Sequence, residues 1–408
     1  MKKLIILLVL LPFFSLSQEY LIRNNAVAKV NLLWDLQAVS NKPKVVWTDQ
    51  KNPVHSLLYS SVDYEGKPTQ VFAYYSNPDL LNGKTGGKVK FPGVVLVHGG
   101  GGKAYKEWVE KWAAKGYAAI AMDLSGNDGT GKKLLQAGPD QDDSYKFQKI
   151  EEGNLKNMWT YHAISSVILA HSFLLNLPEV DPDKTGITGI SWGGYLTCIA
   201  AGLDTRFKVA VPVYGCGYYD ESESFGKMLD VLSGTDKQTW MQYFDPSVYL
   251  LFAKSRFLFV NGNKDSHYNV VPYHKTYLQV NKDKRTICIK PDMIHSHAHG
   301  WEPDEIQHFF EQELRDVKPV TRIKQLNMKG ASIKLTYQSP VSLSQAEFYY
   351  SNDTTSTNAA RGWLKETAVI DAKKSRVTIT KPKEGFKYGF FYLKDARNIS
   401  VSSQFIIN

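Results

Sequence analysis

The chain has 408 residues and a formal net charge of +9, from 49 Lys and Arg against 40 Asp and Glu. A hydrophobic share of 43% with only three cysteines excludes a disordered chain and a disulfide-framed miniprotein, and the length favours two domains. A basic balance is typical of proteins that bind nucleic acid, a membrane surface or an anionic substrate, so the positions of the charges matter.

The first residues are typical of a secretory signal peptide. Lys2 and Lys3 precede an apolar run over 4–14, and small residues follow near Ser17. Eleven apolar residues are too few to span a bilayer of roughly 30 Å, so we expect no integral membrane association. The sequence therefore predicts a cleaved leader over 1–17 and a secreted or periplasmic protein.

Strand and helix patterns then alternate. An alternating stretch over 70–75 indicates an antiparallel strand. Runs of branched apolar residues, typical of strands buried on both faces of a parallel sheet, lie at 91–98, 117–123, 185–189, 208–214, 257–260 and 286–289. Helix patterns lie at 104–115 and, with an amphipathic character, at 157–175, while the polar 125–155 reads as a rim loop. Together they predict a doubly wound, mostly parallel α/β sheet.

The texture changes near residue 317. Period-two alternation, separated by turn residues, is found at 331–337, 346–350, 376–379 and 388–392. We therefore predict a large α/β domain over 18–316, with cap loops at 217–255, and a small C-terminal all-β sandwich of immunoglobulin type over 317–408.

The strongest motif is Gly-Ile-Ser-Trp-Gly-Gly over 189–194. It follows a short apolar strand and opens a helix, which is the setting of a nucleophile elbow. The sharp turn presents Ser191 as a nucleophile, and the flanking glycines leave room where a Cβ would clash. The alternative is a glycine-rich turn with a passive serine.

A second motif, His98 followed by four glycines, comes directly after the first buried strand. Main-chain N–H groups of Gly100 and Gly101, with that of Trp192, could form an oxyanion hole. A phosphate-binding loop is the alternative, but the Gly-Lys-Ser/Thr ending of such loops is missing.

Carboxylate and histidine candidates follow two later strands. Asp265 comes just beyond the strand at 257–260, and His295 follows the strand at 286–289. The order Ser191, Asp265, His295 fits a triad in which the acid orients the base. His297 is the second choice for the base, and His299 is read as a loop residue. A His-x-His-x-His run can also bind zinc, but nothing completes such a site, so we predict no metal and no cofactor.

Several tryptophans fall near the expected catalytic edge. Trp108, Trp240 and Trp301 are predicted to bind substrate, because sugar rings stack on exposed aromatic faces. The alternative for each is packing in the core.

The blocks 95–102, 189–194, 261–265 and 295–300 resemble the α/β-hydrolase superfamily, most closely its acetyl xylan esterase, dienelactone hydrolase and prolyl-oligopeptidase branch. The likeness covers roughly 60–315 and implies Ser191 as nucleophile, Asp265 as acid and His295 as base. The oligopeptidases carry a large N-terminal propeller, for which too few residues precede position 60.

These observations predict a secreted serine esterase acting on acylated carbohydrate. A small-peptide hydrolase and a non-catalytic carbohydrate-binding protein are the alternatives. The basic residues are scattered, without a basic helix carrying interleaved aromatic residues, so we expect no nucleic-acid partner. The oligomeric state is left open.

Overall fold

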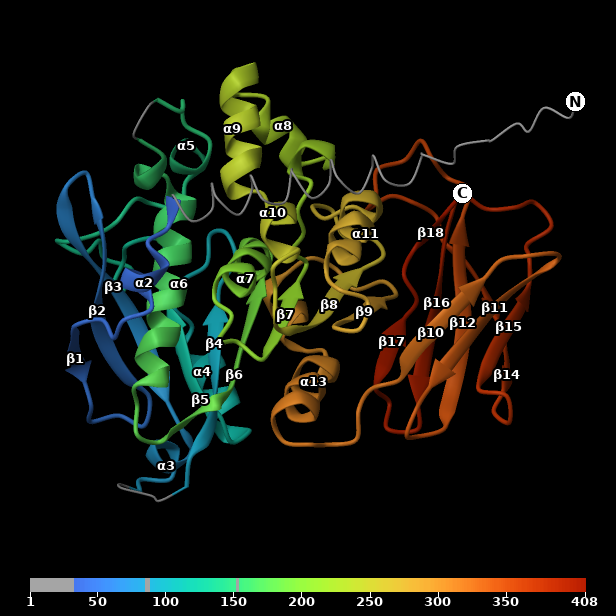
Figure 1. The fold of residues 1–408 in the computed structure, drawn as a ribbon, viewed down its shortest axis with the longest axis horizontal. Helices are drawn as coiled ribbons and strands as arrows, with labels where there is room; N and C mark the ends of the chain where they lie inside the picture. Colours follow the sequence, from blue (N-terminus) through green and yellow to red (C-terminus); the bar gives the residue numbers. More distant parts are fainter. Residues whose placement is uncertain (1–32, 85–88, 152–153) are drawn as a thin grey trace, which may run out of the picture.

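The computed structural model describes residues 33–84, 89–151 and 154–408, so the leader predicted over 1–17 lies outside the described residues. A nine-stranded sheet carries helices on both faces, and two smaller antiparallel sheets lie beyond its last strand (Figure 1). In the described ranges, no helix is both long and apolar enough to cross a bilayer.

The large sheet has the order β1-β2-β3-β5-β4-β6-β7-β8-β9. Its strands are β1 (Val45–Asp49), β2 (His55–Tyr64), β3 (Lys67–Ser76), β4 (Phe91–Val97), β5 (Ala118–Met122), β6 (Val180–Ile190), β7 (Val209–Val213), β8 (Arg256–Gly262) and β9 (Arg285–Lys290). The pairs from β5 through β9 are parallel, and the pairs made by β1, β2 and β3 are antiparallel. The predicted doubly wound, mostly parallel sheet is confirmed.

Helices cover both faces of this sheet. The helices of this part of the chain are α2 (Leu36–Val39), α3 (Pro78–Leu81), α4 (Lys106–Ala114), α5 (Asp143–Lys146), η1 (Asn154–Asn157), α6 (Trp159–Leu175), α7 (Trp192–Leu203), η2 (Tyr219–Glu221), α8 (Phe225–Leu229), α9 (Gly234–Phe244), α10 (Ser247–Leu250), α11 (Val270–Gln279), α12 (His297–Trp301) and α13 (Asp304–Leu314). In Figure 1, α6 and α7 lie in front of the sheet and α4 and α13 behind it. Trp112 of α4 packs against Phe310 of α13, with ring centroids 4.8 Å apart.

The amphipathic pattern predicted for 157–175 is wrong. Helix α6 is buried on all sides rather than on one face. Its polar side has partners inside the protein: the Ser166 carbonyl oxygen accepts from Tyr59, and the Ser172 hydroxyl donates to the Val39 carbonyl oxygen. The N-terminal strands and α2 therefore cover a face that the sequence pattern assigns to solvent.

The three cysteines, Cys198, Cys216 and Cys288, are buried and free. Burial raises the pKa of each thiol. Such thiols are poor nucleophiles and poor disulfide partners, because the reactive form is the thiolate.

The C-terminal strands form two sheets that face each other as a sandwich, as predicted. They are β10 (Arg322–Asn327), β11 (Ser332–Gln338), β12 (Leu343–Ser351), β13 (Leu364–Thr367), β14 (Val369–Asp371), β15 (Arg376–Thr380), β16 (Tyr388–Asp395), β17 (Ser400–Ser402) and β18 (Ile406–Ile407). The sheets have the orders β10-β11-β15-β14 and β13-β12-β16-β17, with β18 on β16. The immunoglobulin type and the boundary at residue 316 stay predictions.

The sandwich packs on the outer edge of the large sheet. Ser402 of β17 accepts a hydrogen bond at 2.9 Å from the main-chain N–H of Ile289 in β9. Beside it, Glu305 accepts from Lys290 Nζ at 2.9 Å, and from the N–H (2.9 Å) and hydroxyl of Ser400. Glu305 is 1% exposed, so this network joins the large sheet to the sandwich away from solvent.

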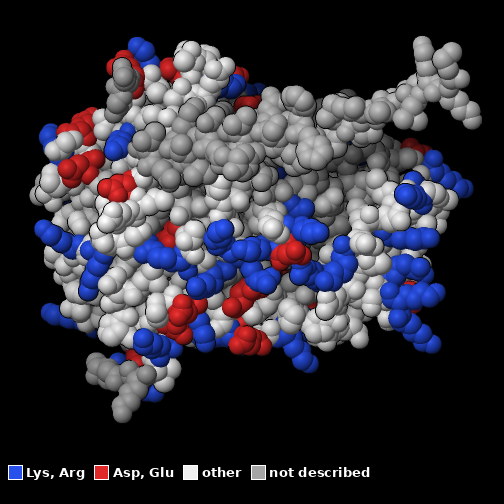
Figure 2. All heavy atoms as spheres, viewed as in Figure 1, with Lys and Arg blue, Asp and Glu red and all other residues white. Residues whose placement is uncertain are grey.

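Basic side chains gather in a belt across the face shown in Figure 2, with acidic side chains among them. Ion pairs take up part of the basic charge, as in Lys208–Asp183, Arg256–Glu313 and Arg322–Asp283. Mixed charge of this kind is typical of a solvated surface.

Replacing Glu305 by alanine removes the acceptor shared by Lys290 and Ser400. We expect the free energy of unfolding to fall by about 1.5–3 kcal/mol, because buried hydrogen bonds to a charged group are lost between the large sheet and the sandwich. Urea unfolding followed by tryptophan fluorescence measures the change. The control is Glu302→Ala at a neighbouring exposed position, expected within about 0.5 kcal/mol of the unsubstituted protein. Equal stability of both variants would contradict a role for this network.

Candidate active site

A cavity of about 850 Å³ opens at the carboxyl ends of β4, β6, β8 and β9. The sheet ends supply one wall, and α8 and the 125–146 segment supply the others. Its lining includes Gly100, Gly101, Gly102, Lys103, Ser125, Gln141, Lys146, Ser191, Trp192, Phe225, Met228, His267, His295 and His297. Ligand sites of open α/β sheets lie at this edge of the sheet.

Ser191 occupies the turn between β6 and α7. Its φ of +58° and ψ of −118° place a non-glycine residue in a strained region of backbone space. The turn is possible because the chain comes very close to its neighbours: a Cβ on Gly189 would collide with the Gly193 carbonyl, and one on Gly193 with the Val97 carbonyl. The hydroxyl of Ser191 is thereby presented at the cavity.

Ser191, His295 and Asp265 lie in one hydrogen-bonded row. His295 Nε2 lies 2.9 Å from Ser191 Oγ, and His295 Nδ1 lies 2.8 Å from Asp265 Oδ2. A carboxylate can only accept, so Nδ1 carries the proton and Nε2 is free to accept the serine proton. The other oxygen of the fully buried Asp265 accepts two main-chain N–H groups, from His267 and Tyr268, both at 2.7 Å.

Aromatic rings hold the His295 imidazole from several sides. The rings of Tyr214 and His267 each lie 4.5 Å from it, centroid to centroid. The Tyr214 hydroxyl donates to the Ile294 carbonyl oxygen at 2.7 Å, next to His295 in the chain. Burial, with His295 close by, lowers the pKa of His267, so a second positive charge beside the imidazole is disfavoured.

The other two histidines of the run point elsewhere. His297 Nε2 accepts the main-chain N–H of Gly99 at 3.1 Å, and burial lowers its pKa to about 4, which keeps it a neutral acceptor. His299 Nδ1 lies 2.7 Å from Ser296 Oγ. The three side chains therefore do not converge on one point, as a zinc site would require.

Ligand-type atoms of Asp265, His267 and His295 lie within 4.8 Å of one another. His295 donates to Asp265 through Nδ1 and accepts from Ser191 through Nε2, so both of its ring nitrogens are occupied. A metal ion here would have to break that row, so the donor set fits the hydrogen-bonded arrangement better than a resident metal.

The glycine loop after β4 lies beside Trp192. A Cβ on Gly100 would lie 2.7 Å from Trp192 Cδ1, so glycine allows this approach. The Gly100 N–H makes no hydrogen bond within the described ranges, and the N–H of Trp192, first residue of α7, has no acceptor within its own helix. These two amides are available to an oxyanion.

Gly101, the other predicted donor, has a different partner. Its N–H donates to Gln141 Oε1 at 3.1 Å. Gln141 Nε2 in turn donates to the Gly102 carbonyl oxygen at 3.0 Å and to the Ser125 hydroxyl. Gln141 thus holds the glycine loop in place, and the Gly101 N–H, predicted as an oxyanion donor, is already used in this contact.

Lys146 is a buried cation in the cavity wall, 4% exposed. Its ammonium lies 4.7 Å from the centroid of the Trp192 ring and 3.3 Å from Asp143 Oδ1. Burial lowers the pKa of Lys146. This group adds positive charge to the side of the cavity that Trp192 also lines.

The predicted tryptophan platforms are wrong. Trp240 is fully buried and donates to the Lys146 carbonyl oxygen at 2.8 Å. Trp108 is 3% exposed and stacks on Trp301 at 5.3 Å, with both rings packed around α4 and α12. None of the three lines the cavity around Ser191. Trp108 and Trp240 use their faces in packing, and the half-buried Trp301 stacks on Trp108 outside this cavity.

Local sequence patterns do not predict that Gln141 and His297 support the glycine loop. Gln141 lies in a polar loop, and it contacts glycines 39 and 40 residues earlier in the chain. His297 contacts Gly99 across 198 residues. A periodic pattern cannot report such pairs, and the position of His297 two residues after His295 was the one available cue.

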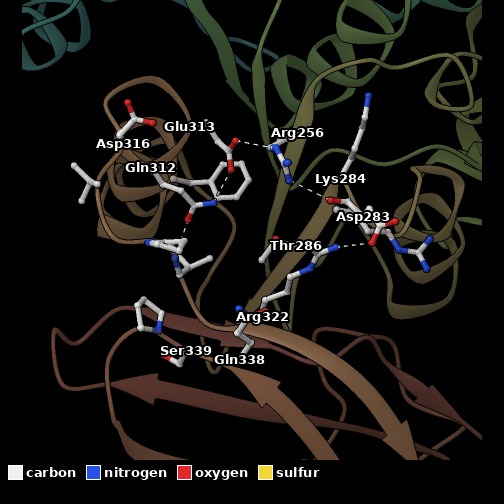
Figure 3. Close-up of a pocket in the computed structure, with 16 residues that line it drawn as sticks. Arg256, Asp283, Lys284, Thr286, Gln312, Glu313, Asp316, Arg322, Gln338 and Ser339 are labelled. Carbon is white, nitrogen blue, oxygen red and sulfur yellow. Dashed lines mark hydrogen bonds and ion pairs between the residues drawn. The ribbon is translucent and has the colours of Figure 1, made fainter. Parts of the chain in front are cut away.

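A second cavity, of about 570 Å³, lies at the junction with the sandwich (Figure 3). Figure 3 shows Arg256 directed to Glu313 and Arg322 to Asp283, at 3.0 and 2.8 Å. Because these charges pair within the cavity wall, we assign it no ligand.

Comparison with known proteins places this geometry in a family. The family model of acetyl xylan esterase matches residues 33–313. The acetyl xylan esterase of a Paenibacillus species is 20% identical, with a TM-score of 0.55 over 70% of this chain and 94% of that chain. Acetyl xylan esterase 1 of a Thermoanaerobacterium species is 18% identical, with a TM-score of 0.52 over 71% and 92%. At these identities the two structures establish the fold.

A curated relative, an uncharacterized peptidase of Bacillus subtilis, is 29% identical over 135 residues. The match spans 31% of this chain and only 17% of that relative. Because the family model covers more than half of the chain, the resemblance found in the motifs is confirmed: the protein belongs to the acetyl xylan esterase family of the α/β-hydrolase superfamily and is a serine-dependent carboxylic ester hydrolase.

Proposed function

We propose that the protein is a secreted esterase that removes acyl groups from carbohydrate through an acyl-enzyme on Ser191. The observation that carries this proposal is the row Ser191–His295–Asp265, whose Ser191 and His295 line a cavity that Gly100 and Trp192 also line. The family supports an acylated carbohydrate as substrate, and the residues 1–17 support secretion.

Each residue has a defined part in the proposed reaction. His295 Nε2 takes the proton of Ser191 Oγ as the oxygen attacks the ester carbonyl carbon. Asp265 orients the imidazole and stabilises the imidazolium. The N–H groups of Gly100 and Trp192 donate to the negatively charged oxygen of the tetrahedral intermediate.

The intermediate then collapses. The bond to the sugar oxygen breaks, and His295 returns its proton to that oxygen, which leaves as a free hydroxyl. A water molecule, deprotonated by His295, attacks the acyl-enzyme, and the second collapse releases the carboxylic acid and restores Ser191.

The cavity suits a polar substrate. Lys146, Gln141 and Ser125 bring hydrogen-bonding groups to the wall, and Trp192, Phe225 and Met228 add apolar surface. A volume of about 850 Å³ is large enough for an acylated sugar unit, since small-molecule sites span about 300–1,000 Å³.

Peptide hydrolysis is the second candidate, favoured by the partial match to a peptidase. Comparing 4-nitrophenyl acetate and acetylated oligosaccharides with prolyl and alanyl 4-nitroanilides separates the two. Cleavage of the anilides without ester turnover would favour the peptidase.

Replacing Ser191 by alanine removes the nucleophile, and we expect kcat on 4-nitrophenyl acetate to fall by at least about 10⁴-fold. A fluorophosphonate probe should label Ser191 in the unsubstituted protein and nothing in the variant, as mass spectrometry can check. Ser144→Ala, at an exposed site outside the cavity, is the matched control and should keep full activity. Full activity of the Ser191 variant would exclude the serine mechanism.

Matched glutamine substitutions identify the base. His295→Gln should lower kcat by about 10³-fold, because a general base is lost. His297→Gln should lower it by about tenfold only, since His297 supports the Gly99 loop without contacting Ser191. Steady-state kinetics near neutral pH measure both, and the reverse ranking would assign the base to His297.

Gln141 provides a test of the loop. Gln141→Ala removes both clamps on the glycine loop, so the Gly100 N–H loses its fixed position and kcat/KM should fall by about tenfold. Gln141→Glu keeps an acceptor for Gly101 but has no donor for Gly102. Its kcat/KM should lie between those of Gln141→Ala and the unsubstituted protein. Unchanged kcat/KM in both variants would mean that the loop holds its shape without Gln141.

A further inference from the structure

We propose that the C-terminal sandwich contributes a positioning residue to the active site. Asn358 holds the loop over residues 263–265, called the acid loop because it carries Asp265. This inference rests on the proposed function, because it concerns the same row of residues. The proposal assigns the sandwich a role in catalysis, although its sequence contains no catalytic motif.

Asn358 lies between β12 and β13 and is 1% exposed. Its side-chain Nδ2 donates to the main-chain oxygen of Asp265 at 2.8 Å and reaches that of Asn263 at 3.4 Å. Its main-chain N–H donates to Glu223 Oε2 at 3.1 Å, in the cap segment. One residue of the sandwich therefore joins the acid loop to the cap of the cavity.

The orientation of the Asn358 amide is determined by its neighbour. Arg361 Nη1 donates to Asn358 Oδ1 at 2.7 Å. A guanidinium can only donate, so Oδ1 must face Arg361 and the NH₂ must face the carbonyl oxygens of the acid loop. Arg361 is itself 5% exposed, donates to the Asp353 carbonyl oxygen at 3.0 Å, and lies 4.4 Å from the Tyr388 ring.

The contact matters because the acid loop is buried. Asn263 is 1% exposed and Asp265 is fully buried, and a buried carbonyl oxygen needs a hydrogen-bond donor. Asn358 supplies that donor from outside the catalytic domain. The Asp265 carboxylate meets His295 on one side of this loop, while its carbonyl meets Asn358 on the other.

The acid loop also connects to the histidine loop. Asn263 Oδ1 accepts the main-chain N–H of Asp292 at 2.8 Å, three residues before His295. A shift of the acid loop would therefore move the Asp265 carboxylate and, at the same time, the segment that leads to His295. Displacements of about 1 Å at such a distance from the chemistry can cost about 100-fold in rate.

The test compares Asn358→Ala and Asn358→Asp in the full-length protein. The first removes the donor, and the second keeps the size and the Arg361 contact but turns an acceptor towards the two carbonyl oxygens. We expect kcat on 4-nitrophenyl acetate to fall by about tenfold or more in both, with KM within about twofold, since the cavity wall is unchanged.

The pH profile separates positioning from mere domain packing. A poorly aligned Asp265 stabilises a positive charge on the base less, so the acid limb of the kcat/KM profile should move to lower pH in Asn358→Ala, which adds no charge of its own. Glu305→Ala, which weakens the same domain junction away from Asp265, should lose stability but keep both kcat and the profile.

A variant at a neighbouring position tests the same contact if the Asn358 variants do not fold. Arg361→Met leaves Asn358 in place but frees its amide, and should give a smaller fall in kcat with the same direction of pH shift. If the Asn358 and Arg361 variants keep kcat within about twofold and leave the pH profile unchanged, the inference is overturned. If Ser191→Ala stays active, the proposed function fails, whatever the Asn358 variants show.

Discussion

The site depends on a close approach of main chain at the turn after β6. Side chains at Gly189 and Gly193 would collide with carbonyl oxygens of the turn itself and of the end of β4. Their absence lets α7 begin directly beneath Ser191 and brings the glycine loop after β4 beside Trp192. The strain at Ser191 persists because two neighbouring strands hold the turn, the Val213 carbonyl oxygen accepting the Ser191 N–H at 2.9 Å.

Around this turn the parallel sheet brings distant parts of the chain together. Strands β6, β8 and β9 end at the same edge, so the residues that follow them meet, although Ser191 and His295 are 104 residues apart. Support comes from further away: Gln141 and His297 hold the glycine loop, and Asn358 contacts the acid loop. The residues that face the cavity are thus few, and those that hold them come from most of the chain.

The sequence predicted what repeats locally. Apolar runs indicated the strands, and a polar residue just after a strand end indicated Ser191, Asp265 and His295, which the structure brings into hydrogen-bonding distance. Side-chain direction was harder to predict. Trp108 and Trp301 lie near the edge of the sheet that the sequence predicted, yet their rings stack on each other. Which face a helix buries depends on the elements that pack against it, and a local pattern does not report these.

The cover that β17 provides over β9 has a consequence for biosynthesis. Ser402, which bonds the main chain of Ile289, is made 113 residues after it. At about 5–20 residues per second, the edge of β9 therefore waits roughly ten seconds for its cover during synthesis. An uncovered edge strand readily pairs with another chain. The edge of the newly made large sheet is thus open to pairing with other chains until the sandwich folds onto it.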